Sequence, residues 1–181
     1  SGADITRFTT LRDIPAYQQQ PIDVALSVVH DTRLDKLDTA ALRIDKGARI
    51  ELLPGSKLSL ETTKQILVDG TLIAHGGSID LHISPEGRSP QYRADQAIWL
   101  GPDARLDASA TFVAVPNDLG LAQAVTFDAG SVSLRADRGY VVALPGSSID
   151  VSGARQTLDV TRTSALHPEP VDVALNAGSI T

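Results

Sequence analysis

Residues 55–74 read GSKLSLETTKQILVDGTLIA, and this stretch decides the fold. It holds three short apolar runs bounded by glycine, and apolar residues alternate with polar ones in the period of two that is typical of strands. Similar triplets of runs cover residues 77–110 and 130–153. A unit of this size cannot bury its own apolar face, so it must stack on neighbouring copies.

Glycine opens each copy and marks the corners where the backbone needs a positive φ. An antiparallel sandwich would instead need repeated Asn-Gly or Asp-Gly hairpin turns, and Asp69-Gly70 is the one such pair in the copies. Short strands alternating with tight corners therefore predict an all-β chain that folds as a right-handed parallel β-helix, a solenoid with loop insertions.

The organisation follows from this repeat. Residues 1–21 are predicted to be an extended lead-in, and residues 22–181 a β-helix segment with strands at 22–29, 41–45 and 48–52 ahead of the first copy. Because Gly178 begins another copy, the segment is expected to be excised from a longer solenoid.

Three excursions interrupt the copies, at 84–92, 111–129 and 154–176, and a solenoid accepts such insertions as loops. The apolar run 112–115 predicts a further strand in the second excursion, and 171–175 returns to the strand period in the third. The first excursion is the candidate surface contact loop, because loops on a rigid scaffold often carry recognition. Its expected anchors are Arg88, Tyr92 and Arg93.

Composition narrows the function classes. The 181 residues carry a net charge of -6, and the 16 basic residues are scattered among 22 acidic ones, which argues against a nucleic-acid partner. No apolar run approaches the roughly 20 residues that span a bilayer, so no membrane span is expected. Cysteine is absent, so neither disulfides nor thiolate metal sites are expected.

Residues with catalytic or metal-binding chemistry are sparse. Asp80 and His82 would point outward from one strand, but two ligands do not fix a transition metal. Asp107 and Asp150, each followed two residues later by serine, resemble the paired carboxylates that polysaccharide-cleaving enzymes use as general acid and base or as calcium ligands. Alternatively, they bind the backbone amides of corners. Trp99 is either partly buried packing or a platform for a sugar ring. We therefore expect no catalytic, cofactor-binding or metal-binding residues.

A series of phrases is spread along most of the chain, at residues 41–44, 47–50, 65–74, 76–79, 98–101 and 138–142. This ordered series resembles filamentous haemagglutinin-like exoproteins of the two-partner secretion type, which are large bacterial adhesins. The resemblance implies a very long protein that is exported through a partner outer-membrane transporter and forms a β-helical fibre on the cell surface or in the medium. The Asn-Pro-Asn type of motif that marks the amino-terminal secretion domain of that family is missing, which indicates an internal or carboxy-proximal segment.

The sequence thus predicts a structural and adhesive segment of an extracellular or surface-bound bacterial fibre that serves in attachment, biofilm formation or contact-dependent display. It is not expected to be an enzyme or to need a cofactor. Its expected partners are the transporter and a receptor or glycan on a host or bacterial surface. The alternative is a carbohydrate-active β-helix enzyme, a polysaccharide lyase or hydrolase, which requires outward carboxylates from adjacent turns at a groove. A third reading is a module that serves export alone.

Overall fold

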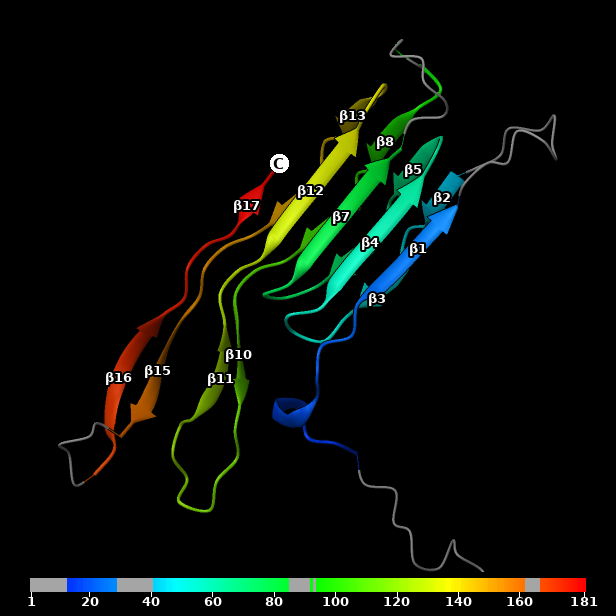
Figure 1. Cartoon of the computed structure of the whole chain (residues 1–181). Helices are drawn as coiled ribbons and strands as arrows, with labels where there is room; N and C mark the ends of the chain where they lie inside the picture. Colours follow the sequence, from blue (N-terminus) through cyan, green and yellow to red (C-terminus); the bar gives the residue numbers. More distant parts are fainter. Residues whose placement is uncertain (1–12, 29–40, 85–91, 93, 162–166) are drawn as a thin grey trace, which may run out of the picture.

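The computed structural model describes residues 13–28, 41–84, 92, 94–161 and 167–181 (Figure 1). Their regular structure is β except for one 3₁₀ turn, η2 (Ala16–Gln18), which lies in the lead-in segment that was expected to be extended. The all-β prediction is therefore confirmed for the described residues.

Most strands belong to three parallel sheets. Sheet A contains β1 (Val24–Val28), β4 (Lys57–Thr62), β7 (Ser78–Ile83), β12 (Ser131–Ala136) and β17 (Ser179–Ile180). Sheet B contains β2 (Ala41–Ile44), β5 (Gln65–Val68), β8 (Ala97–Leu100) and β13 (Tyr140–Ala143). Sheet C contains β3 (Arg49–Glu51), β6 (Thr71–Ile73), β9 (Arg105–Asp107) and β14 (Ser148–Asp150).

The chain visits sheets A, B and C in that order before it returns to sheet A, and we call each such visit a pass. The passes are β1-β2-β3, β4-β5-β6, β7-β8-β9 and β12-β13-β14, after which β17 re-enters sheet A (Figure 1). The first pass, residues 24–51, precedes the copies that the sequence repeat defines. This arrangement of parallel sheets is compatible with a β-helix.

The register of the passes differs by one residue from the simplest alignment of the copies. Ser56, and not Gly55, lies opposite Gly77, because Lys57 pairs with Ser78 and the Ser78 N–H donates to the Ser56 carbonyl at 3.1 Å. Gly55 and its counterpart Gly76 both have positive φ, +83° and +61°, so both are turn residues. The first copy therefore has a serine where the other two copies have Gly77 and Gly130.

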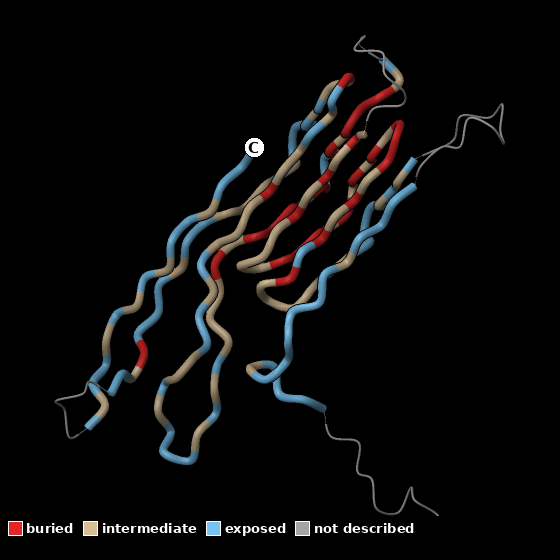
Figure 2. Tube along the Cα trace, viewed as in Figure 1, coloured by how far each residue is buried: buried red, intermediate tan, exposed pale blue. Residues whose placement is uncertain are grey.

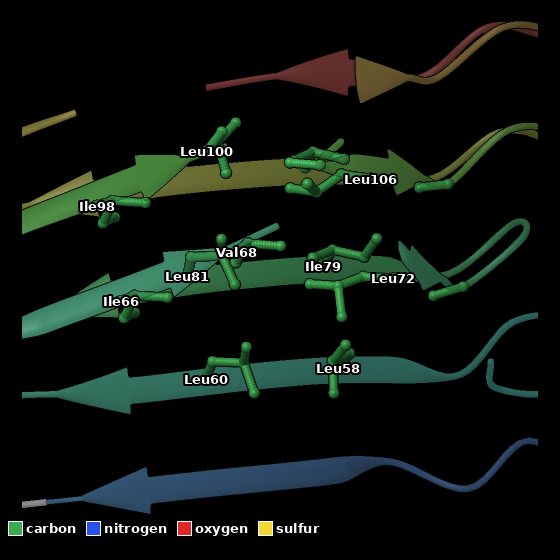
Figure 3. Close-up of a cluster of buried hydrophobic side chains, with 14 of the residues drawn as sticks. Leu58, Leu60, Ile66, Val68, Leu72, Ile79, Leu81, Ile98, Leu100 and Leu106 are labelled. Carbon is green, nitrogen blue, oxygen red and sulfur yellow. The ribbon is translucent and has the colours of Figure 1, made fainter. Parts of the chain in front are cut away.

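The core consists of inward-facing residues that stack from pass to pass (Figure 3). Leu58, Ile79 and Val132 are register partners in sheet A, and each is fully buried. The period of two predicts these positions correctly. Burial is densest in the middle passes (Figure 2), whereas Leu26 in the first pass is 41% exposed and Ile180 in the last strand is 53% exposed.

Two antiparallel hairpins lie outside the parallel sheets. They are β10 (Thr111–Ala114) with β11 (Ala124–Phe127), and β15 (Arg155–Val160) with β16 (Glu169–Ala174). The expected strands near 112–115 and 171–175 are confirmed, whereas β11 and β15 were not foreseen. Both hairpins leave the corner between sheet C and sheet A and project from the same end of the sheets (Figure 1).

The hairpins are joined to each other and to the corner. The backbones of Ala122 and Asp159 are bonded, with the Asp159 N–H donating to the Ala122 carbonyl at 2.8 Å. At the hairpin bases the Asn176 N–H donates to the Asp128 carboxylate at 2.8 Å. Phe127 packs against the corner glycine Gly55, with its ring 3.2 Å from the place where a Cβ would be. The insertions therefore form a connected layer beside the corner.

Candidate functional site

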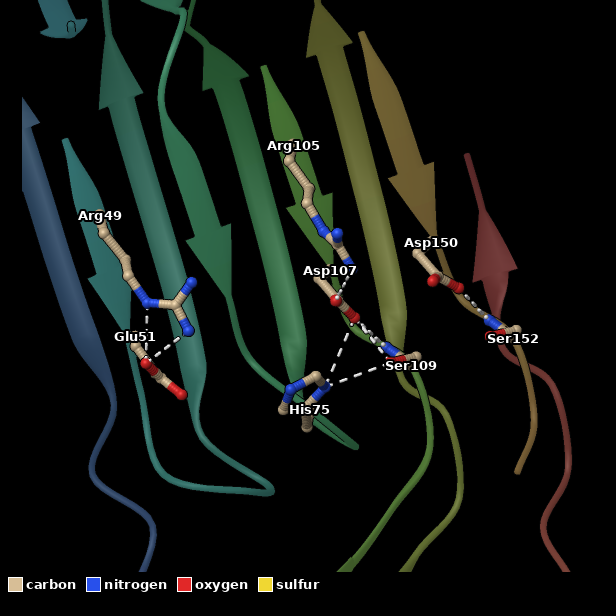
Figure 4. Close-up of polar contacts among 8 residues, drawn as sticks. All are labelled: Arg49, Glu51, His75, Arg105, Asp107, Ser109, Asp150 and Ser152. Carbon is tan, nitrogen blue, oxygen red and sulfur yellow. Dashed lines mark hydrogen bonds and ion pairs between the residues drawn. The ribbon is translucent and has the colours of Figure 1, made fainter. Parts of the chain in front are cut away.

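A cluster of four polar side chains lies at the end of sheet C (Figure 4). Arg105 and Asp107 are outward residues of β9, Ser109 follows that strand, and His75 follows β6 in the preceding pass. The register of β6 and β9 brings His75 beside Ser109, so residues 34 apart in sequence share one site.

Asp107 is the centre of this cluster. Its Oδ1 accepts hydrogen bonds from Ser109 Oγ at 2.6 Å and from the Ser109 N–H at 3.1 Å, while its Oδ2 accepts one from Arg105 at 2.9 Å. His75 Nδ1 lies 3.4 Å from Oδ1. Burial opposes ionisation of this carboxyl group, but the hydrogen bonds from Ser109 and Arg105 outweigh it and hold the pKa below the ordinary value. Asp107 is therefore ionised at neutral pH.

Asp150 is the register partner of Asp107 on β14 and repeats part of its bonding. Asp150 Oδ1 accepts a hydrogen bond from the Ser152 N–H at 2.9 Å, as Asp107 does from the amide of Ser109. Of the two readings that the sequence left open, these bonds support the one in which each carboxylate binds a corner amide.

The arrangement gives little support to hydrolysis. In a Ser-His-Asp triad the imidazole bridges the other two groups and takes the hydroxyl proton. Here Ser109 donates its proton directly to Asp107, and the same nitrogen of His75 faces both side chains. A general acid needs a raised pKa, and the pKa of Asp107 is lowered. The cluster therefore stabilises the corner of sheet C.

His75 and Arg105 were missed as partners of Asp107. A sequence signal existed for the arginine, because an arginine precedes an acidic residue by two positions at several places and both side chains then lie on the same side of a strand. The structure forms an ion pair at each of Arg43–Asp45, Arg49–Glu51, Arg105–Asp107 and Arg135–Asp137. No comparable signal marks His75, which reaches Asp107 only through the register.

Asp80 and His82 lie on β7 in sheet A, on a different sheet from Asp107 and Asp150. They point outward as expected, because Ile79, Leu81 and Ile83 are fully buried. The ring nitrogens of His82 face carboxylates of the neighbouring strands and loops. Nε2 lies 3.4 Å from Asp137 and Nδ1 lies 3.8 Å from Glu61. In the part of the chain that the structure describes, no group of three or more His, Asp or Glu residues is placed to hold a metal ion.

The candidate contact loop lies mostly outside the described residues, including Arg88 and Arg93. Tyr92 is described, is 65% exposed, and stacks on Tyr140 with ring centroids 6.4 Å apart. Tyr140 in turn meets Trp99 edge to face at 5.9 Å. Trp99 is half-buried on the outer face of sheet B, so part of its ring packs against neighbours and part is exposed.

No family model matches this sequence, and neither the curated proteins nor the solved structures contain a significant match. Among the described residues, no helix has the length and apolar character that crossing a membrane requires.

Proposed function

We propose that residues 22–181 are a segment of a right-handed parallel β-helix and act as a structural and adhesive part of a large secreted bacterial surface fibre. The observation that carries this proposal is the in-register pairing of successive passes. Each of the three sheets continues from the first pass to the fourth, and in sheet A the inward residues of successive passes are apolar except for Thr62. Such a pattern can be repeated without limit.

A stack of this kind makes a stiff rod. Backbone hydrogen bonds run from pass to pass, each pass adds about 4.8 Å of length, and the inward side chains exclude water along the axis. The outward residues are free to vary because they do not take part in the stack. A protein built from many such passes would hold adhesive surfaces at a distance from the cell.

In this proposal the full-length protein reaches the cell surface or the medium through an outer-membrane transporter of the two-partner type. The resemblance in residues 65–79 and 138–142 supports this route. Co-purification of the full-length protein with its transporter tests the proposed route. Immunogold labelling of intact cells tests the proposed location, and we expect a signal on the surface of intact cells. Labelling that appears only after the cells are lysed would contradict the proposed location.

The enzyme alternative has less support. Its strongest observation is that Asp107 and Asp150 are register partners on adjacent strands. Asp107, however, is almost fully buried and its oxygens are occupied by Ser109 and Arg105. Asp80 lies on another sheet and adds no third carboxylate. We therefore propose that the chain is not an enzyme.

Duplication of one pass tests the β-helix directly. Residues 56–76 span one repeat of the register, from Ser56 to the residue before its partner Gly77. Inserted in tandem, this segment should form an additional pass and raise the melting temperature, because stacked repeats add stability through each new interface. The matched control inserts the same residues in scrambled order and should lower it. A tandem copy as destabilising as the scrambled one would contradict the solenoid.

A further inference from the structure

A groove of about 220 Å³ lies on the outer face of sheet B. One of its walls is a row of register partners, in which Arg43 pairs with Leu67 and Leu67 pairs with Trp99. Asp69 and Gly101 lie two residues after Leu67 and Trp99. They therefore continue the outward face and also line the groove. It is remote from the cluster around Asp107, which belongs to sheet C.

Gly101 allows the Asp69 side chain to approach closely. A Cβ on Gly101 would overlap Asp69 Oδ1, so any larger residue would displace this carboxylate. Asp69 Oδ1 accepts a hydrogen bond from the Asp103 N–H at 3.1 Å, which holds the carboxylate in place. Among the described residues Oδ2 has no hydrogen-bond partner, so one acceptor oxygen remains at the groove.

The indole of Trp99 is held by a neighbouring ring. Tyr140 meets it at an interplanar angle of 80°, and Tyr92 stacks on Tyr140 at 29°. Contacts of this kind fix the orientation of aromatic rings. The groove therefore has a rigid aromatic surface beside a positioned carboxylate.

The rim adds both a donor and further acceptors. Arg43 and Asp45 form an ion pair at the first-pass end of the groove, with side chains 68% and 70% exposed. The hydrogen bond and the charge of Asp45, together with the charge of Asp69, raise the pKa of Arg43, so its guanidinium remains a donor. Exposed pairs of this kind contribute little to stability, so nothing in the fold requires them here.

We propose that this groove binds a neutral pyranose ring of a glycan. This inference rests on the adhesive role proposed above and specifies the class of ligand for that role. Such a ring has an apolar C–H face that packs on an aromatic ring, and hydroxyl groups on its edge that donate to carboxylates and accept from guanidinium. Trp99 supplies the first contact, Asp69 and Arg43 the second. Concave sites with an apolar surface and a few positioned polar groups are typical of small-ligand binding.

An acidic sugar fits less well, because Asp45 and Asp69 both line the groove. A lysine or arginine side chain of a protein partner would also suit an aromatic ring beside carboxylates. The guanidinium of Arg43 opposes a second cation at the same place. Salt dependence separates the two ligands, because ion pairing weakens as salt is added whereas binding of a neutral sugar does not.

Trp99 is the one tryptophan of the sequence, so its fluorescence reports on this groove alone. The test titrates the whole chain with methyl glycosides of glucose, galactose, mannose and N-acetylglucosamine, and with their disaccharides. We expect a saturable change in emission for at least one of them, with Kd on the order of millimolar because a monosaccharide has few atoms with which to bind. The affinity should not change with salt.

Two variants locate the binding. Asp69→Asn should weaken it by about tenfold, because the aligned acceptor loses its charge. Trp99→Leu should abolish binding as measured by calorimetry or ligand-observed NMR. The matched control Glu51→Gln, on sheet C, should bind as the unmodified chain does. The proposal is overturned if no glycoside changes the emission, if Asp69→Asn binds normally, or if a lysine peptide binds in a salt-dependent manner instead. A failure here leaves the result of duplicating residues 56–76 unaffected, so the two proposals fail separately.

Discussion

Gly130 lies directly against the backbone of Gly77 in the neighbouring pass. A Cβ built on Gly130 would overlap the carbonyl group of Gly77, and the same carbonyl accepts a hydrogen bond from the Ser131 N–H at 3.0 Å. Gly178 stands in the same relation to Gly130 on the other side. The strands β7, β12 and β17 can therefore begin in register only because the residue before each of them has no side chain; these residues are Gly77, Gly130 and Gly178.

Replacing Gly130 by alanine should destabilise the protein by about 1–3 kcal/mol, because the added methyl group meets backbone that cannot rotate away. Thermal and urea denaturation measure the change. The control is Ser133→Ala, an outward position of the same strand β12, which should be nearly neutral. Equal stability of the two variants would show that the passes are not in contact at Gly130.

Replacing Ile98 by aspartate should cost several kcal/mol, because Ile98 is fully buried between Ile66 and Val141 and a charge there has no partner. Leu134→Asp should cost less, since Leu134 is half-buried in the last complete pass. Ser133→Asp places the same charge on the outer face and is the matched control. If Ile98→Asp had the same melting temperature as Ser133→Asp, the inward assignment of Ile98 in sheet B would be wrong.

Asp107→Asn should lower the stability at pH 7 by about 1.5–3 kcal/mol, the range for hydrogen bonds to a charged group. The pKa of Asp107 is lowered in the folded chain, so its ionised form stabilises the fold above the ordinary pKa of an aspartate and loses this effect as the pH falls through the lowered value. The difference in the free energy of unfolding between the unmodified chain and Asp107→Asn should therefore shrink below about pH 4.

Urea denaturation from pH 7 down to the acid limit measures this difference. Asp150→Asn is the control, because Asp150 accepts a hydrogen bond from Ser152 without the additional partners of Asp107, and its effect should be smaller. A gap between the unmodified chain and Asp107→Asn that widened in acid would contradict the bonding described for this carboxylate.

Phe127→Ala should loosen the hairpin β10–β11 from the corner while the parallel sheets stay folded. Phe127 covers Gly55 and the neighbouring corner glycine Gly76, so it is an apolar link between the hairpin and the corner. Limited proteolysis should then cut faster in the hairpin loop, residues 115–123, with little change in melting temperature. The control is Thr126→Ala, which is exposed on the opposite face of the same strand. Unchanged cleavage in Phe127→Ala would mean that the contact does not restrain the hairpin.

The sequence predicts the strands of the sheets well because their inward residues must alternate. Leu58 and Leu60 are separated by Ser59, and this pattern alone sets both the strand and its buried face. The first pass is harder to recognise as a repeat, because the largely polar residues 30–39 separate its apolar runs in the sequence. The β10–β11 hairpin is harder to predict than the sheets, because the loop between Ala114 and Ala124 carries no short turn signal of the Asn-Gly type.

The sites were predictable only in part. Asp107, Asp150 and Trp99 stand out by residue type, but their neighbours depend on the register between passes. His75 meets Ser109 and Asp69 meets the Asp103 amide across 34 residues in each case, and that distance includes the excursion 84–92. The alignment of the copies locates this excursion but does not show which outward side chains bond across the register, so these contacts could not be read from the sequence.

The first two passes close the corner between sheets C and A with a few residues, whereas the next two passes have a hairpin there. Both hairpins leave the corner at equivalent positions, and the strands beyond them still pair in register. Appendages of different lengths can therefore be added at this corner without a shift in the pairing. Successive appendages must then emerge about 4.8 Å apart along one side of the molecule. A fibre built this way would act as a ruler, with the spacing of whatever it presents fixed by the backbone and the content of each presented segment free to diverge.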